Sequence, residues 1–277
     1  MGSMDLVIAD AIEAAAWRDM YAAMPAPMAA ATGARVVEAG GATLFVAPGI
    51  PTPFFNRAVG LGNERPAREA DLDAILAVYD GLGVRSFLVH TSAATQAAGD
   101  LEAWLGARGL GPFAERPSWA KCLRGPEPPP AVSTQLTLRA AEATRARPLG
   151  AVLAEAHGMP AAMVPWIMAL VGRPGWSAYV MEDGEEVVGG GFLWRDGDRA
   201  WLGLGGTAAA HRRRGGQRAL FARRLGDAAA AGATVIATET GEPLTGEANP
   251  SLANMEWAGF RRVGARRNWT RYSPTET

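Results

Sequence analysis

The sequence contains one long internal repeat. Val-Gly-Leu-Gly at 59–62 corresponds to Leu-Gly-Leu-Gly at 202–205. Each copy later has a glycine with a tryptophan ten residues after it: Gly109 with Trp119, and Gly259 with Trp269. A repeat of this length indicates two copies of one structural plan. The 277 residues also exceed the roughly 100–200 of a typical domain, so we expect two units and not one core.

Hydrophobic periodicity predicts the same order of elements in both halves. In the first half we expect strands at 35–38, 43–46 and 56–61, a helix at 69–80, a strand at 86–90, a helix at 98–108 and a strand at 113–123. In the second half we expect a strand at 135–138, helices at 149–157 and 161–171, strands at 177–181, 186–194 and 200–205, a helix at 216–231, a strand at 234–239, a helix at 249–258 and a strand at 261–272. Each half therefore predicts a sheet flanked by helices.

A proline-rich break separates the copies. Residues 124–131 are Arg-Gly-Pro-Glu-Pro-Pro-Pro-Ala. Three consecutive prolines near a glycine favour extended polyproline conformation and exclude a helix. We therefore place a linker at 125–132, between a first domain at 4–124 and a second at 133–277.

The formal net charge of -1 conceals a difference between the halves. Residues 1–132 carry 10 Lys and Arg against 14 Asp and Glu, whereas residues 133–277 carry 17 against 14. An anion site is therefore expected in the second half. The excess there is small and Lys121 is the only lysine, so we expect no broad nucleic-acid-binding face and no nucleic-acid partner.

Composition limits the compartment and the cofactors. The lone Cys122 cannot form an intramolecular disulfide, and one Cys with three scattered His supplies no zinc site, so we expect no metal. The N-terminus is acidic where a secretory signal would be basic. The long uncharged run between Glu155 and Arg173 contains two prolines and is shorter than the roughly 20 apolar residues that span a bilayer. We expect a soluble cytoplasmic protein, a monomer or homodimer, with no membrane partner.

The second copy is longer than the first at one place. From Gly62 to Gly109 there are 47 residues, whereas from Gly205 to Gly259 there are 54, and the extra length contains His-Arg-Arg-Arg-Gly-Gly-Gln at 211–217. This segment joins a predicted strand to a predicted helix. Paired glycines let backbone N–H groups approach an anion, and arginines beside a helix N-terminus oppose its dipole unless an anion binds there. The alternatives are an anion site and a solvated charge run.

These motifs resemble the GNAT superfamily of acetyl-CoA-dependent N-acetyltransferases. In that family a strand leads through Arg/Gln-x-x-Gly-x-Gly/Ala into a helix, and residues 212–216 match this pattern, with Gln217 in the last position. Residues 249–260 look like the second cofactor motif, a helix that starts with Asn and ends in Gly-Phe. The resemblance covers 134–277, and the first half resembles the same fold without the phosphate loop. It implies an α/β (α+β) protein of two tandem GNAT-like domains, each with a mixed, mostly antiparallel sheet flanked by helices, the first copy being degenerate.

The resemblance also implies a set of cofactor-binding residues for acetyl-CoA as cosubstrate. Backbone along the splayed strand would bond the pantetheine arm, the loop and helix N-terminus would hold the pyrophosphate, and two asparagines would contact the arm from the following helix. The residues concerned are Leu204, Gly205, Gly206 and Thr207, then Arg212, Arg213, Arg214, Gly215, Gly216, Gln217 and Arg218, and finally Asn249 and Asn254.

Acetyl transfer to a primary amine of a small-molecule acceptor needs a base that removes a proton, directly or through water. Glu239, near the end of a predicted strand, is the candidate base; binding a substrate cation or capping a turn is the alternative role. Met255 stands where the family often has a tyrosine acid. An acyl-CoA-binding or sensing module without catalysis therefore remains a second hypothesis. His157, at the end of a predicted helix, has a possible catalytic role or a charge-based structural one.

Overall fold

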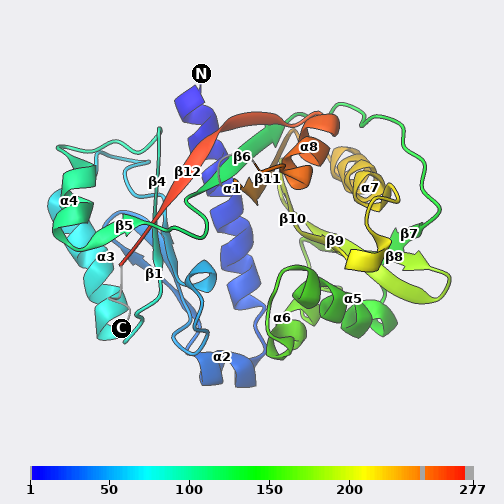
Figure 1. The fold of residues 1–277 in the computed structure, drawn as a ribbon, viewed down its shortest axis with the longest axis horizontal. Coiled ribbons are helices and arrows are strands. Elements are labelled where there is room, and N and C mark those ends of the chain that lie inside the picture. Colours follow the sequence, from blue (N-terminus) through cyan, green and yellow to red (C-terminus); the bar gives the residue numbers. More distant parts are fainter. Residues whose placement is uncertain (1, 244–246, 272–277) are drawn as a thin grey trace.

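The protein forms one continuous mixed sheet with helices on both faces, as a computed structural model that describes residues 2–243 and 247–271 shows (Figure 1). Strand order along the sheet is β1-β2-β3-β4-β12-β6-β11-β10-β9-β8-β7, and β5 pairs with β12 beside this path. Neighbouring strands are antiparallel except for two parallel pairs, β3 with β4 and β10 with β11. The predicted mixed, mostly antiparallel sheet with flanking helices is confirmed.

The first half opens with a long helix that the repeat did not predict. Its elements are α1 (Gly2–Ala22), α2 (Ala26–Thr32), β1 (Arg35–Ala39), β2 (Ala42–Val46), a 3₁₀ turn (Pro53–Phe55), β3 (Arg57–Val59), α3 (Glu69–Gly81), β4 (Leu88–Ser92), α4 (Leu101–Ala107), β5 (Leu110–Pro112) and β6 (Ser118–Arg124). The single strand expected at 113–123 is therefore two strands, β5 and β6, separated by a loop.

The second half follows its predicted order closely. Its elements are β7 (Thr137–Ala140), α5 (Ala143–Ala156), a 3₁₀ turn (Ala161–Met163), α6 (Val164–Met168), β8 (Trp176–Asp183), β9 (Glu186–Asp196), β10 (Arg199–Thr207), a 3₁₀ turn (Ala209–His211), α7 (Gly216–Ala230), β11 (Val235–Gly241), α8 (Pro250–Trp257) and β12 (Arg261–Arg271). α5 begins six residues earlier than expected. Pro148 lies inside it, although a proline favours the start of a helix over its interior, so the sequence predicted a start after this residue. Tyr272, expected in the last strand, lies outside the described residues.

The two halves exchange their last strands. β12 of the second half pairs with β4 of the first, and β6 of the first half pairs with β11 of the second. β6 and β12 also pair with each other at the centre, where Arg266 lies opposite Trp119. Figure 1 shows β12 crossing from the second half to the first. The segment predicted as a linker at 125–132 therefore lies between the two halves in sequence, but one sheet continues through both.

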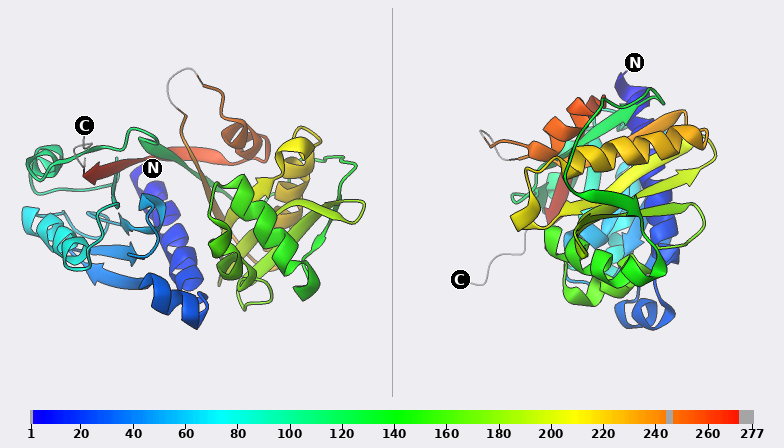
Figure 2. Two further views of the ribbon diagram at one scale, coloured as in Figure 1. Left: turned by 60° about the horizontal axis from the view of Figure 1, so that its bottom comes forward. Right: turned by 90° about the vertical axis from the view of Figure 1, so that its right-hand side faces the viewer.

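α1 lies where the halves meet (Figures 1 and 2). Leu6, Ala9, Ile12, Ala16 and Met20 recur every three or four residues and are buried, which makes one apolar stripe along the helix. α1 contacts β6, β10, β11 and β12, and thus strands of both halves. α1, a helix of the first half, therefore covers the centre of the sheet, where strands of both halves meet.

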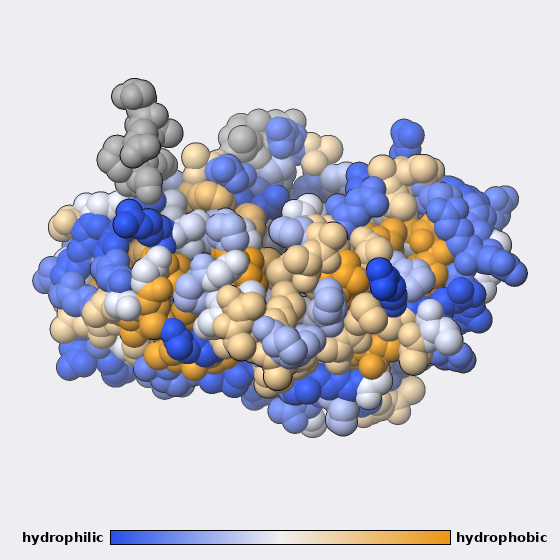
Figure 3. All heavy atoms as spheres, turned by 90° about the horizontal axis from the view of Figure 1, so that it is seen from below, coloured by the Kyte–Doolittle hydropathy of each residue, from blue (hydrophilic) through white to orange (hydrophobic). Residues whose placement is uncertain are grey.

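The other helices are divided between two sheet faces. α5 and α6 share an apolar core with α1, whereas α7 and α8 form a second core and α3 and α4 a third. Viewed from the side of α2, α5 and α6, apolar side chains lie between polar ones across the middle of the surface (Figure 3).

Within residues 2–243 and 247–271, no helix has the length and apolar character needed to span a bilayer.

Candidate active site

β10 and β11 run together and then separate. They pair in parallel only from Arg199 to Trp201, opposite Val235 to Ala237. β10 continues to Thr207 along β9, with a bulge between Gly203 and Gly206 and a φ of 50° at Leu204, whereas β11 continues along β6. In the described residues no backbone hydrogen bond joins 204–207 to 239–241. β11 therefore gives this stretch of β10 no strand partner, and two of its backbone groups are bonded by side chains instead: Leu204 by His157, and the Thr207 carbonyl by Arg212.

α7 begins at the end of this divergence. Gly215 precedes the helix with a φ of 79°, a left-handed conformation that suits glycine. Among the residues that the structure describes, no side chain accepts a hydrogen bond from the first turn of α7. The first N–H groups of a helix lack partners within the helix and carry its positive dipole end. This terminus therefore has the donors and the charge that a phosphate requires.

The arginines of the loop differ in their surroundings. Arg214 is ion-paired with Asp183, with N···O distances of 2.5 and 3.2 Å, which holds the pKa of Asp183 below its usual value. Arg212 and Arg213 are exposed, and the Arg212 Nε–H donates to the Thr207 carbonyl at 3.2 Å. Arg212 is therefore free of a carboxylate within the described chain, whereas Arg214 already has one.

The other predicted cofactor residues lie around the same helix terminus. Gln217 Nε2 donates to Thr207 Oγ1 at 2.7 Å and connects α7 to β10. The exposed Arg218 donates to Asn254 Oδ1 at 3.2 Å, which joins α7 to α8. Asn249 Oδ1 caps α8 by accepting from the Leu252 N–H at 3.0 Å. Gln217 and Arg218 thus join the first turn of α7 to β10 and α8, whereas Asn249 donates from Nδ2 to the Gly241 carbonyl at the end of β11 at 3.1 Å.

Glu239 lies on β11 just beyond the last residue that pairs with β10. Its carboxylate accepts from Trp201 Nε1–H at 3.1 and 3.2 Å and lies 3.3 Å from Lys121 Nζ. Its side chain is 9% exposed. Burial and the nearby Glu13 carboxylate raise the pKa of Glu239 against the opposing effect of Lys121. A raised carboxyl pKa suits a base that works near neutral pH, and this role of Glu239 stays a prediction.

Glu239 belongs to a buried charge network that the sequence did not reveal. Three cations and three carboxylates meet under α1: Arg57, Lys121 and Arg266, with Asp10, Glu13 and Glu239. Burial alone would favour the neutral acid, but Arg266, Lys121 and Arg57 hold the pKa of Glu13 well below its usual value. Only one trace of it is local: Asp10 and Glu13 lie on the apolar stripe of α1, where a buried carboxylate needs a cation, but the sequence does not say which cations meet them. Most members belong to the first half, so that half supports the environment of Glu239.

The remaining residues of interest have separate places. His157 follows α5 and is exposed, and its Nε2 lies 3.8 Å from the position of a Cβ on Gly206. Partial desolvation beside β10 lowers its pKa against the opposing effect of a hydrogen bond to the Leu204 backbone. Met255, at the position of the family tyrosine, is buried in the core shared by α7 and α8. Burial raises the pKa of Cys122 to about 11, so its thiol stays protonated at neutral pH. Among the residues with assigned positions, no group of three or more His, Cys, Asp or Glu is arranged for a metal.

In the first half the corresponding strands are closed together. After β3 and β4, the Gln96 N–H donates to the Gly62 carbonyl at 3.1 Å. The Ala67 N–H donates to the Gln96 carbonyl at 2.9 Å, and the Ala98 N–H to the Ala67 carbonyl at 2.8 Å. These bonds join the segments that diverge in the second half. The backbone groups of these segments are therefore hydrogen-bonded within the first half itself.

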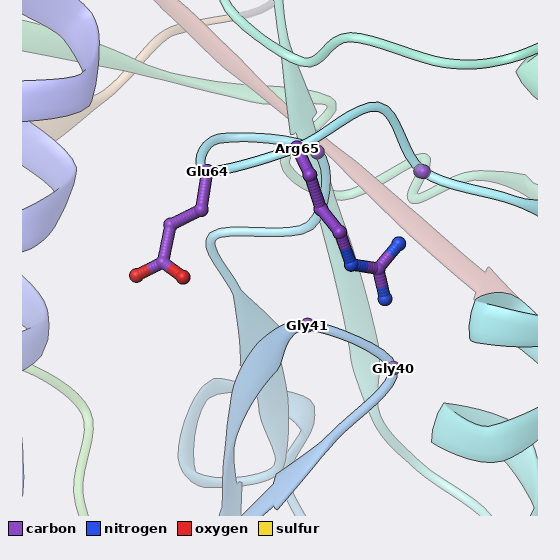
Figure 4. A pocket seen from close by; sticks show the side chains of 6 residues that line it. Gly40, Gly41, Glu64 and Arg65 are labelled. Carbon is purple, nitrogen blue, oxygen red and sulfur yellow. The ribbon is translucent and has the colours of Figure 1, made fainter.

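The N-terminus of α3 is also occupied by its own side chains. Asp71 accepts from the Arg68 N–H at 2.8 Å and from Arg65 at 2.6 and 2.8 Å. A cavity of about 210 Å³ lies beside it, lined in part by Gly40, Gly41 and Arg65 (Figure 4). Because Asp71 neutralises the arginine and fills the helix terminus, the first copy offers no counterpart of the α7 site.

Comparison with known proteins supports the fold. No family model matches the sequence, and no curated protein matches it. Among solved structures, a GCN5-related N-acetyltransferase from Kribbella flavida superposes with a TM-score of 0.62 at 16% identity, over 88% of this chain and 91% of that one. One from Sphaerobacter thermophilus has a TM-score of 0.59 at 16% identity, over 83% and 80%. A tandem GNAT protein from the clavulanic acid biosynthesis pathway has a TM-score of 0.55 at 17% identity, over 84% and 80%. The chain therefore has the fold of the GNAT N-acetyltransferases, as its motifs predicted.

Proposed function

We propose that the protein is an N-acetyltransferase that moves an acetyl group from acetyl-CoA to a primary amine of a small molecule. The observation that carries this proposal is the divergence of β10 from β11, which ends at the uncapped N-terminus of α7. The GNAT fold supports acetyl transfer in general. The closed strands and filled helix terminus of the first half support a proposal with one cofactor site, in the second half.

In this proposal the pantetheine arm lies along residues 204–207 of β10, and the pyrophosphate lies at the first turn of α7. Arg212, Arg213 and Arg218 are exposed there and have no carboxylate partner in the described chain. A diphosphate would offset three positive charges that otherwise oppose the helix dipole. Arg214 does not contact the phosphates in this proposal. It positions the loop, because its ion pair with Asp183 holds the loop against the β8–β9 hairpin.

The chemistry needs one base and a leaving thiolate. The amine nitrogen forms a bond to the acetyl carbon, the carbon–sulfur bond breaks, and CoA leaves as a thiolate. The amine proton passes to Glu239 directly or through one water, and the raised pKa of Glu239 suits this transfer. A thiol has a pKa of about 8.5, so the thiolate can leave and take its proton from solvent without the tyrosine that Met255 replaces.

A cofactor-binding module without catalysis is the second candidate. It is favoured by the buried position of Met255 and by the ion pair of Glu239 with Lys121, since a carboxylate held by an ammonium is a weaker base. The two candidates share the acetyl-CoA site and differ only in turnover.

Free-thiol release from acetyl-CoA with a panel of primary amines separates them. The transferase predicts amine-dependent thiol release that Glu239→Gln lowers at least 100-fold, with acetyl-CoA affinity unchanged. Acetyl-CoA binding without thiol release for any amine would favour the binding module. Arg218→Glu should weaken acetyl-CoA binding, whereas Arg35→Glu, an equal change on the exposed edge of β1, should not.

A further inference from the structure

An arginine of the first half lies at the end of β11 beside the proposed active site. Arg116 comes from the loop between β5 and β6, and its guanidinium rests against Gly241, where Nη1 is 1.6 Å from the place a Cβ would occupy. Its Cζ lies 5.3 Å from the ring centre of Trp119 and 6.0 Å from that of Phe54. Two aromatic rings and a glycine thus determine where this cation lies.

The loop that presents Arg116 is fixed to the central strand β12. Asn268, which is fully buried, donates from Nδ2 to the Arg116 carbonyl at 2.6 Å. The Asn268 N–H donates to the Pro117 carbonyl at 2.9 Å, and the Phe113 N–H donates to the Asn268 carbonyl at 2.9 Å. Three hydrogen bonds to one buried residue hold the loop, so the guanidinium has a defined place without a polar partner of its own.

Arg116 has donors without acceptors. In residues 2–243 and 247–271 its guanidinium makes neither an ion pair nor a hydrogen bond, although it is half-buried. The neighbouring Trp119 Nε1–H is buried and has no acceptor in the same residues. A planar guanidinium held against aromatic faces is arranged to bind a carboxylate through two of its N–H groups.

The position of this cation relative to Glu239 follows from strand register. Glu239 pairs with Lys121 and Gly241 pairs with Trp119, so the two β11 residues face the same side of the sheet. Two residues along a strand span about 7 Å. The strand positions that carry the proposed base and the free cation are therefore about 7 Å apart on one face, a spacing that the two ends of a small amino carboxylate can span.

We propose that Arg116 binds a carboxylate of the acceptor, so that the substrate class is a small amine carrying a carboxylate a few bonds from its amino group. This inference rests on the proposed function, which places the amine at Glu239. It also gives the degenerate half a direct role, because the loop at 113–117 would select the acceptor while the second half holds the cofactor.

The test compares α- and ω-amino carboxylates with their primary amides by calorimetry in the presence of millimolar CoA. In the wild type at least one carboxylate should bind about tenfold or more tightly than its amide. Arg116→Gln should reduce this ratio to about one. Gly241→Ala should lower the ratio of carboxylate to amide affinity although Arg116 keeps its charge, because the new Cβ occupies the place of the guanidinium. Arg35→Gln, an equal loss of charge on β1, should leave the ratio unchanged.

Three results would overturn the proposal: equal binding of carboxylates and amides by the wild type, a ratio unchanged in Arg116→Gln, or no binding of any panel member at millimolar concentration. Failure of the proposed function is seen separately. Thiol release at equal rates with carboxylates and amides would keep the transferase and remove the role of Arg116. Carboxylate-dependent binding without thiol release would keep the role of Arg116 and remove the transferase.

Discussion

Replacing Lys121 with methionine tests whether the six buried charges at the junction of the halves form one balanced network. Lys121 is fully buried and contacts Glu13, Glu239 at 3.3 Å and Asp10 at 3.6 Å. Its loss leaves three carboxylates facing two arginines. Removing one partner of a buried ion pair costs about 3–5 kcal/mol of folding free energy, because the other charge stays buried without compensation. We expect a loss of that size in urea unfolding near neutral pH.

The stability loss in Lys121→Met should depend on pH. Glu239 has a pKa above its usual 4.5, and removal of the nearby ammonium raises it further. At a pH between 4.5 and the raised pKa of Glu239, the folded state of Lys121→Met therefore binds a proton at Glu239 that the unfolded state does not bind. Stability of the variant relative to wild type should recover as the pH falls through this window.

The double variant Lys121→Met with Glu239→Gln is the control. It removes one charge of each sign and should recover most of the lost stability, since replacing a buried ion pair by neutral groups is often close to neutral. A loss below about 1 kcal/mol in Lys121→Met, or a loss that does not shrink on acidification, would refute the balanced network. A double variant no more stable than the single one would refute it equally.

Three further predictions concern single contacts. Trp201→Phe removes the hydrogen bond to Glu239 that lowers its pKa, so the acid limb of the pH–rate profile should move to higher pH; an unmoved limb would argue against Glu239 as the base. Arg218→Glu should weaken acetyl-CoA binding about 10- to 100-fold by calorimetry, and unchanged affinity would place the pyrophosphate elsewhere. Asp71→Asn should cost about 1.5–3 kcal/mol in urea unfolding at neutral pH. Because Arg65 and Arg68 hold the Asp71 pKa well below 3.8, that difference should begin to shrink as the pH falls below 3.8 and disappear as it falls through the lower pKa of the folded state.

Local patterns predicted most of the cofactor side of the site. The strand, arginine loop and helix of the second half lie within a few residues of one another in sequence, so propensity and glycine placement were enough to find β10 and α7. The GNAT fold was predicted from the same residues and is confirmed. The partner of Arg214 was not predicted, because Asp183 lies 31 residues away and meets it only through the β8–β9 hairpin.

The junction of the halves was not predicted because it depends on pairing between distant strands. A repeat in sequence indicates two similar units, but it does not say that β6 and β12 cross over. The charge network and the place of Arg116 both follow from that exchange, since β6 brings Lys121 beside Glu239 and the loop before β6 brings Arg116 beside Gly241. Contacts of this kind depend on tertiary structure and leave little trace in local periodicity.

Titration of the full chain with acetyl-CoA by calorimetry, repeated with Arg218→Glu and Arg35→Glu, tests most directly that the second half alone holds the cofactor. The site at the end of β10 and the closed strands of the first half predict binding of one acetyl-CoA per chain, weakened by Arg218→Glu and unchanged by Arg35→Glu. No binding at millimolar acetyl-CoA, two sites per chain, or equal binding by all three proteins would contradict it.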